Sequence, residues 1–251
     1  MRCALKAIAL AMALVTTHVS AVSAQAQVAV AANFAEPIKA IAAVLEKTTG
    51  HTIRVTLGGT GRLYNQIKNG APFDVLLSAD TATPEKLETE GLAMPGSRFT
   101  YATGKLVLWS ANANRVDNQG QILKAADLGR VAYASPKLAP YGAAAVQTMD
   151  KLGLTATLAP KLVQGESIGQ TFTFASTGNA DVGFVAMSQV LEGGKLKSGS
   201  MWVVPQALYG PIRQDAVVMQ KSATNEAALA LMQLLKSPNI KDLIRSYGYS
   251  L

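Results

Sequence analysis

The chain contains 251 residues, with a formal net charge of +7, two His and a single Cys, Cys3. Cys3 lies in an N-terminal segment typical of an export signal, so the rest of the chain can form no disulfide, no thiol nucleophile and no zinc site of Cys and His. The basic residues are scattered and are not interleaved with aromatic residues, which disfavours nucleic-acid binding.

Residues 1–26 have the three parts of a signal peptide. Arg2 and Lys6 precede an apolar run at 7–15, and Ala24 and Ala26 form a small-x-small cleavage site. We expect cleavage near Ala26, which places the mature chain outside the cytoplasm and lowers its net charge from +7 to +5 through the loss of two basic residues. No later apolar run approaches the ~20 residues that a membrane span requires, so we expect no membrane insertion.

Apolar strand patterns alternate with helical patterns through the rest of the chain. The predicted strands cover 28–32, 53–57, 75–78, 105–110, 131–134, 161–163, 182–185, 201–205 and 216–219. The predicted helices cover 36–48, 63–69, 141–152, 168–176, 225–235 and 240–246, and a further helix begins at Pro84 with Thr83 as its N-cap. This alternation predicts an α/β fold of mainly parallel sheets with flanking helices. The alternation falls into two series, one before and one after the strand at 105–110. Two series predict two lobes with a ligand cleft between them.

Two early strands end in small or amide residues and lead directly into helical patterns, at 28–34 and at 55–62. Such a turn presents free backbone N–H groups at a helix N-terminus, which is a site for an anion. Asn33 adds a side-chain amide, Thr60 adds a hydroxyl, and the glycines around Thr60 let a ligand approach the backbone closely. The alternatives are a plain N-cap role for Asn33 and an ordinary tight turn at 58–61.

Two later loops have the same position between a strand and a helix. In the loop 136–142, Pro140 restricts the start of the helix and Tyr141 offers its N–H and hydroxyl; the alternative is a rigid loop with Tyr141 as a packing residue. In the loop 165–169, Ile168 lies where a free N–H points into the cleft; the alternative is a helix capped by Ser167.

Catalytic patterns are weak in this chain. His51 lies in a turn far along the sequence from the candidate loops, and there is no Gly-x-Ser-x-Gly motif. Asp80 and Asp181 are candidate ligands for a divalent metal, but no pattern pairs them. Arg62 is a candidate anion clamp, although a solvated helix residue is the interpretation that we favour.

Taken together, these segments resemble the periplasmic molybdate-binding proteins of ABC-type molybdate importers. The resemblance covers the whole mature chain. Its motifs are Ala-Ala-Asn-Phe at 31–34, Gly-Gly-Thr-Gly at 58–61, Asn-Gly-Ala-Pro-Phe-Asp-Val at 69–75, Ser-Ala-Asp at 78–80, Gly-Lys-Leu-Val-Leu at 104–108, Ala-Pro-Tyr-Gly at 139–142, Gly-Asn-Ala-Asp-Val-Gly-Phe-Val at 178–185 and Tyr-Gly-Tyr at 247–249.

The resemblance implies a two-lobed class II periplasmic binding protein fold, with one lobe formed by 27–104 plus 206–251 and the other by 105–205. It implies capture of molybdate, and of tungstate, in the cleft between the lobes and delivery to the membrane permease of an ABC importer. The protein would be a monomer without a cofactor and without enzymatic activity. Molybdenum would be present only as the oxyanion, with no direct bond from protein to metal.

Four residues match positions that bind the oxyanion in this family: Asn33, Thr60, Tyr141 and Ile168. Ala32 and Gly59 flank two of them and complete the expected site. The chain departs from many relatives at Ala186, where they carry a Tyr hydroxyl donor, and Ala32 lacks a hydroxyl that some relatives have there.

Two other functions stay open. The first is a binding protein for a different anion, such as sulfate, phosphonate or an organic acid, and the organic acid would require a clamp such as Arg62. The second is a periplasmic hydrolase, which would need His51, the only His outside the signal segment, as its base.

Overall fold

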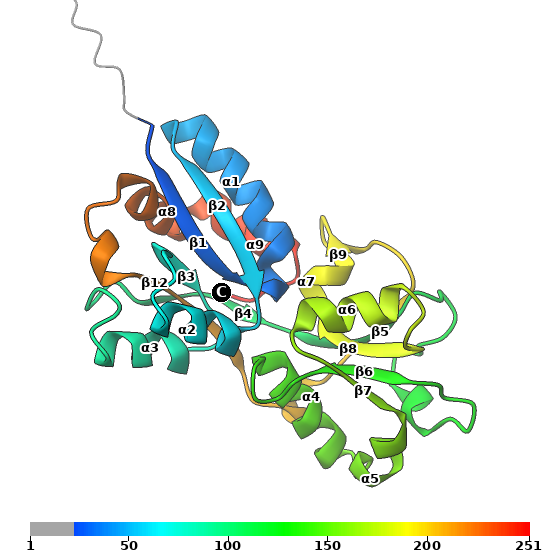
Figure 1. Ribbon diagram of the computed structural model, residues 1–251. Coiled ribbons are helices and arrows are strands. Elements are labelled where there is room, and N and C mark those ends of the chain that lie inside the picture. The colour runs from blue at the N-terminus through cyan, green and yellow to red at the C-terminus, as the bar shows by residue number, and fades with distance from the viewer. Residues whose placement is uncertain (1–22) are drawn as a thin grey trace, which may run out of the picture.

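The computed structural model describes residues 23–251, which form two five-stranded sheets (Figure 1). The first sheet has the order β2-β1-β3-β12-β4, with β1 Gln25–Ala31, β2 Thr52–Gly58, β3 Val75–Leu77, β4 Phe99–Gly104 and β12 Ile212–Val218. The second has the order β11-β5-β8-β6-β7, with β5 Leu106–Ser110, β6 Val131–Ala134, β7 Leu162–Gly165, β8 Val182–Ala186 and β11 Ser200–Val203. A short hairpin, β9 Leu191–Glu192 and β10 Lys195–Leu196, lies outside both sheets.

Four strands of each sheet run in one direction and a single strand runs against them. In the first sheet this strand is β12, which is antiparallel to both β3 and β4. In the second it is β5, which is antiparallel to both β8 and β11. The sheets are therefore mainly parallel, as predicted.

Helices cover both faces of each sheet, because the strands are apolar on both sides. Around the first sheet lie α1 Ala35–Thr49, α2 Thr60–Lys68, α3 Ala82–Thr89, α8 Glu226–Lys236 and α9 Pro238–Ser246. With the second sheet lie α4 Pro140–Lys151, α5 Thr155–Leu158, α6 Ile168–Ser176 and α7 Met187–Val190. The 3-10 turns are η1 Ala32–Phe34, η2 Gln121–Lys124, η3 Ala159–Lys161, η4 Gln206–Leu208 and η5 Gln220–Ser222.

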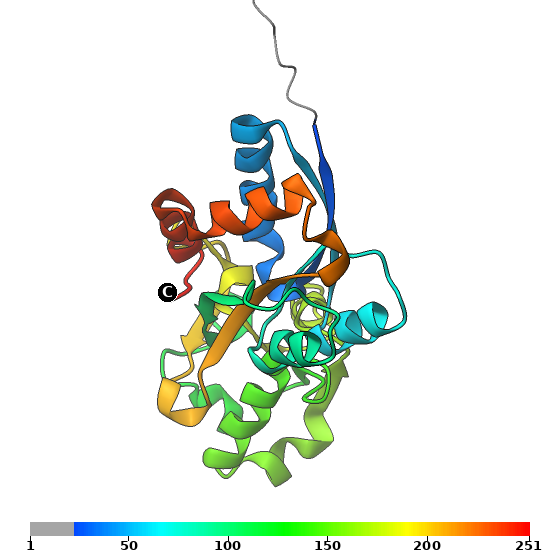
Figure 2. The ribbon, with the colours of Figure 1, turned by 90° about the vertical axis from the view of Figure 1, so that its left-hand side faces the viewer.

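The chain crosses between the two sheets twice, from β4 into β5 and from β11 into β12. Figure 2 shows the second crossing, where the orange strand β12 rises from the green half of the molecule toward the half that contains the blue helix α1. The C-terminal segment returns to the first crossing, because Ser250 pairs with Thr103 of β4. Both crossings therefore lie beside the chain end, between the two sheets.

The structure differs from the sequence analysis in two local features, one strand that was missed and one helix cap that was wrong. Strand β4 was not predicted; it is stabilised by pairing with the distant strand β12. Thr83 does not cap α3, which begins at Ala82. Its N–H and its hydroxyl both donate to the carboxylate of Asp80, at 2.9 and 3.1 Å, so the Asp80 carboxylate satisfies the first turn instead.

Of the predicted export signal, residues 1–22 lie outside the described part. Within residues 23–251, no helix is both long and hydrophobic enough to span a bilayer.

The start of β1 gives a stability prediction. Gln25 and Ala26 pair with Thr52 and Ile53 of β2, and Ala26 is fully buried. A chain that begins at Gln27 should therefore be less stable than one that begins at Gln25, by about 1–3 kcal/mol, because it loses strand hydrogen bonds and a buried methyl group. Urea unfolding of the two proteins measures the difference, and equal midpoints would show that these pairs contribute nothing.

Candidate functional site

One small cavity lies where the strand ends of the two sheets face each other. Its volume is about 10 Å³, about the space that one water molecule needs, whereas pockets for organic solutes typically hold about 300–1,000 Å³. A polyatomic ligand therefore enters this cavity only when the surrounding loops lie further apart. It is lined by Ala31, Ala32, Asn33, Gly58, Gly59, Thr60, Ala79, Ala139, Pro140, Tyr141 and Ile168. All six predicted site residues are among these eleven lining residues, and none of the eleven carries a charge.

Helix starts converge on this cavity from both sheets. Thr60 and Ile168 are the first residues of α2 and α6, and Tyr141 is the second residue of α4. Asn33 lies in η1, directly before α1. The N–H groups of a first helical turn have no acceptor within their own helix, and they carry the positive end of the helix dipole. The cavity wall therefore offers donors to a negatively charged group without using a basic side chain.

The hydroxyl of Thr60 is held as a donor. Thr60 is only 2% exposed, and its Oγ1 accepts a hydrogen bond from the Ala79 N–H at 3.1 Å. This bond uses one lone pair of the oxygen, and the hydroxyl hydrogen has no acceptor among the described residues, so it is free to donate.

Asn33 is fixed from several sides. Its Nδ2 donates to Gln214 Oε1 at 2.8 Å and to Tyr249 Oη at 2.9 Å, and its carbonyl accepts from Ser188 Oγ at 2.7 Å. The N-cap of α1 is Phe34, so the plain N-cap alternative for Asn33 is wrong. Within residues 23–251, its buried Oδ1 has no hydrogen-bond partner. Oδ1 is thus the atom of this amide that no protein group engages.

The hydroxyl of Tyr141 is in contact with other protein groups. It accepts from Gln214 Nε2 at 3.1 Å and lies against Gly104, where a Cβ would overlap it. Burial raises the pKa of this hydroxyl well above its usual range, so it stays protonated. The group that Tyr141 can offer to the cavity is therefore its backbone N–H.

Ile168 is positioned by a residue that the sequence did not indicate. Its carbonyl accepts from Gln189 Nε2 at 3.1 Å, and Gln189 Oε1 accepts from the Ala186 N–H at 2.9 Å. Ser167 caps α6 by accepting from the Gln170 N–H at 3.2 Å, as the alternative interpretation expected. Capping by Ser167 and a cavity position for Ile168 thus occur together.

Arg62, which an organic-acid site would need, and His51, which a hydrolase would need, both lie away from the small cavity. Arg62 does not line the cavity; its side chain is 63% exposed and lies 4.0 Å from Glu166. His51 accepts from the Ala24 N–H at 3.2 Å, at the opposite end of β1. That end is roughly 20 Å from the cavity, because β1 has seven residues.

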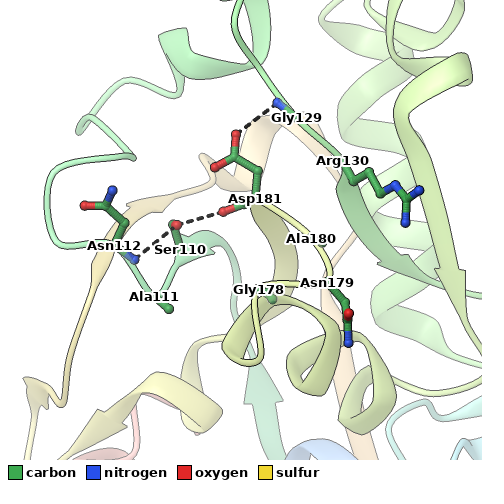
Figure 3. Close-up of a pocket in the computed structure, with 10 residues that line it drawn as sticks. Ser110, Ala111, Asn112, Gly129, Arg130, Gly178, Asn179, Ala180 and Asp181 are labelled. Carbon is green, nitrogen blue, oxygen red and sulfur yellow. Dashed lines mark hydrogen bonds between the residues drawn. The ribbon is translucent and has the colours of Figure 1, made fainter.

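Acidic residues form no metal site in the described part of the chain, where no group of three His, Cys, Asp or Glu residues gathers. A larger cavity of about 580 Å³ lies at the far end of the second sheet (Figure 3). Two of its polar residues are paired within the protein: Asp181 accepts from the Gly129 N–H at 3.0 Å, and Ser110 donates to the Asp181 carbonyl at 2.7 Å. Of these two cavities, only the small one lies where helix starts from both sheets meet, which makes it the better candidate site.

Sequence reasoning missed the residues behind the cavity wall, namely Tyr101, Ser188, Gln189, Gln214 and Tyr249. The sequence contains one indication of these supporting residues. Gln214 and Asp215 are polar residues that directly precede the apolar run 216–218 of β12, and both are at most 2% exposed. Buried polar residues in a strand indicate a hydrogen-bond network.

The chain is similar to known solute-binding proteins over most of its length. A family model described as bacterial extracellular solute-binding protein matches residues 26–250. The molybdate-binding protein ModA of Azotobacter vinelandii is 56% identical over 232 residues, which cover 92% of each chain. ModA of Rhodobacter capsulatus is 57% identical over 221 residues, which cover 88% of this chain and 86% of the relative. A solved structure of an Azotobacter vinelandii periplasmic molybdate-binding protein matches with a TM-score of 0.87 and 41% identity, over 90% of this chain and 99% of that chain.

The contact between Gly104 and Tyr141 gives a prediction that needs no ligand. Gly104→Ala should lower the free energy of unfolding by about 1–3 kcal/mol, because the new Cβ overlaps the buried Tyr141 hydroxyl. Gly210 is the matched control on the other crossing, since a Cβ there meets only Gln147 Oε1 at 3.7 Å. Chemical denaturation of the two variants measures the difference, and equal stabilities would contradict the overlap.

Proposed function

The chain belongs to the molybdate-binding branch of the bacterial extracellular solute-binding proteins, and we propose that it captures molybdate, and tungstate as well, in the small cavity between its two sheets. The predicted α/β fold of a two-lobed periplasmic binding protein is confirmed by the family match over residues 26–250 and by the solved structure that covers 90% of this chain; we propose that it is of class II. The protein acts in the periplasm and delivers its ligand to the permease of an ABC importer.

The observation that carries this proposal is the chemistry of the cavity wall, where donors meet and no charged side chain is present. A buried dianion needs dense hydrogen bonding to replace its water. Hydrogen bonds to charged groups contribute about 1.5–3 kcal/mol each, so a few prearranged donors are enough for tight binding. We assign these donors to the Thr60 hydroxyl, the Asn33 amide, and backbone N–H groups at Tyr141 and Ile168, with Ala32 and Gly59 completing the wall.

Molybdate and phosphate differ in their protonation at neutral pH, and this difference determines which hydrogen-bonding groups each anion needs. Molybdate is fully deprotonated at neutral pH and needs donors only. Phosphate keeps a proton there and also needs an acceptor. Sulfate has the charge and shape of molybdate but is smaller, so rejection of sulfate depends on how well the cavity wall fits the larger ion.

We assign residues 27–104 with 206–251 to one lobe and residues 105–205 to the other. The distribution of strands between the two sheets supports this division. Contacts across the cleft support a closed form: the Gly61 N–H donates to the Leu138 carbonyl at 3.0 Å. A Cβ on Gly59 would lie 3.0 Å from that same carbonyl oxygen, so the backbones meet closely. Closure creates the surface that the permease recognises.

The described residues near the cavity suit a protein that binds and releases its ligand without changing it chemically. The only His of the described chain is paired at the far end of β1, and no general base lines the cavity in the described residues. We therefore propose a monomeric transport protein without enzymatic activity and without a cofactor, in which molybdenum is bound as its oxyanion only.

Calorimetric titration of the protein tests the ligand class. Molybdate and tungstate should bind tightly, and sulfate should bind at least about tenfold more weakly because it fills the cavity less well. Phosphate should not compete. Equal affinity for sulfate and molybdate would overturn the selectivity, and heat release with an organic acid alone would overturn the ligand class.

Side-chain donors can be tested one at a time. Thr60→Val and Asn33→Ala should each weaken molybdate binding by about 1–3 kcal/mol, because each removes a donor to a charged ligand. Thr60→Ser keeps the hydroxyl and should bind nearly as wild type does. Arg62→Ala serves as the control, since the Arg62 side chain is exposed and lies outside the cavity. Unchanged affinity in both donor variants would remove the site assignment.

A further inference from the structure

Ala24, the residue directly before β1, is held by the folded chain. Its carbonyl accepts from the Thr52 N–H at 3.0 Å, and its N–H donates to His51 Nδ1 at 3.2 Å. Its methyl group packs against the core of the first sheet. Ala24 is therefore part of the fold, although it lies ahead of the cleavage point that the sequence predicts near Ala26.

The peptide bond between Ala26 and Gln27 lies inside the first sheet. Ala26 is 0% exposed and pairs with Ile53 of β2. On the side of β3, the Gln27 N–H donates to Asp74 Oδ2 at 2.6 Å, and the Gln27 carbonyl accepts from the Asp74 N–H at 2.7 Å. Partners thus occupy both edges of β1 at this bond, so that a protease reaches it only when the strand is open.

A mature chain that began at Gln27 would also lose contacts. An amine at Gln27 would face the Asp74 carboxylate, which favours this start. The same cut, however, removes the pairs of Gln25 and Ala26 with β2, together with both hydrogen bonds of Ala24. Tolerance of a truncation depends on the burial and hydrogen bonding of the backbone that is removed. By this criterion the fold favours a cut ahead of Ala24.

The sequence contains a second small-x-small pattern at that place. Ala21 and Ser23 occupy its two small positions, with Val22 between them. Cleavage after Ser23 makes Ala24 the first residue and leaves β1 complete. Ser23 is exposed and lies outside the sheet, where its hydroxyl donates to the carbonyl of Gly50 at 2.7 Å.

His51 offers an acceptor to the N-terminus that this cut creates. Hydrolysis adds one water molecule across the bond: the Ser23 carbonyl carbon takes the hydroxyl group, and the Ala24 nitrogen leaves as an amine that takes the proton. Because this nitrogen keeps its place beside His51, the amine donates where the peptide N–H did. A hydrogen bond from a charged donor is stronger than one from a neutral N–H.

We propose that signal peptidase cuts the bond between Ser23 and Ala24, so that the mature protein begins at Ala24 and His51 binds its amine. The exported protein then keeps every residue of β1 and the Ala24 contacts that precede it. This processing step is independent of the ligand that the cavity binds.

The intact mass of the exported protein tests the cleavage point. The full-length precursor is produced in a bacterium with a periplasm, and the protein is purified from that compartment. Its mass should be that of residues 24–251. A mass of residues 27–251 would overturn the proposal, and so would a mass of residues 25–251, because both products lack Ala24.

A pair of variants tests the recognition of this bond. Ser23→Tyr enlarges one of the two small positions, so the product that begins at Ala24 should disappear. Gln25→Tyr is the matched control, because it introduces the same side chain at an exposed position that neither pattern requires to be small. Its product should still begin at Ala24. Wild-type yield of that product from Ser23→Tyr would contradict cleavage at this bond.

The contact with His51 is tested by urea unfolding of two purified chains, 24–251 and 25–251. His51→Ala should lower the unfolding midpoint more in the longer chain, because only that chain carries the amine that His51 binds. Equal shifts in the two chains would overturn the role of His51.

Discussion

A dianion that leaves water must receive hydrogen bonds from every side, and here no basic residue lines the cavity to help. This electrostatic requirement explains the architecture. Strand ends of two mainly parallel sheets face each other, and the helices that follow direct their first turns inward. Each helix start contributes partial positive charge that is fixed in the backbone. The fold itself therefore supplies the donors, and selectivity depends on how far the two lobes can approach each other.

Behind these donors lie buried neutral side chains, Tyr101, Tyr141, Ser188, Gln214 and Tyr249, which are hydrogen-bonded to one another and connect to Asn33. The three tyrosines Tyr101, Tyr141 and Tyr249 stay protonated, because burial raises the pKa of each hydroxyl. A phenolate at this depth would repel the ligand. The absence of a side chain at Gly104 lets Tyr141 of one lobe reach Gln214 of the other at the first crossing.

Sequence patterns predicted the α/β class, most of the elements and the loops that surround the cavity, because these features depend on short segments. The loops after β1, β2, β6 and β7 were found because strand ends followed by helix starts are local signals. The supporting residues could not be found in this way. Asn33 bonds to residues 181 and 216 positions away, Gln214 and Tyr249, and only the two crossings bring them together. Strand β4 was missed for the same reason, because its partner β12 lies more than a hundred residues later.

The pairing of Ser250 with Thr103 places the last residues of the chain beside the first crossing, and Tyr249 bonds to Asn33 near the start. Asn33 therefore has its full set of contacts only after the segment around Tyr249 has docked beside the first crossing. The site thus depends on contacts between residues more than two hundred positions apart, and contacts of such high sequence separation are slow to form during folding.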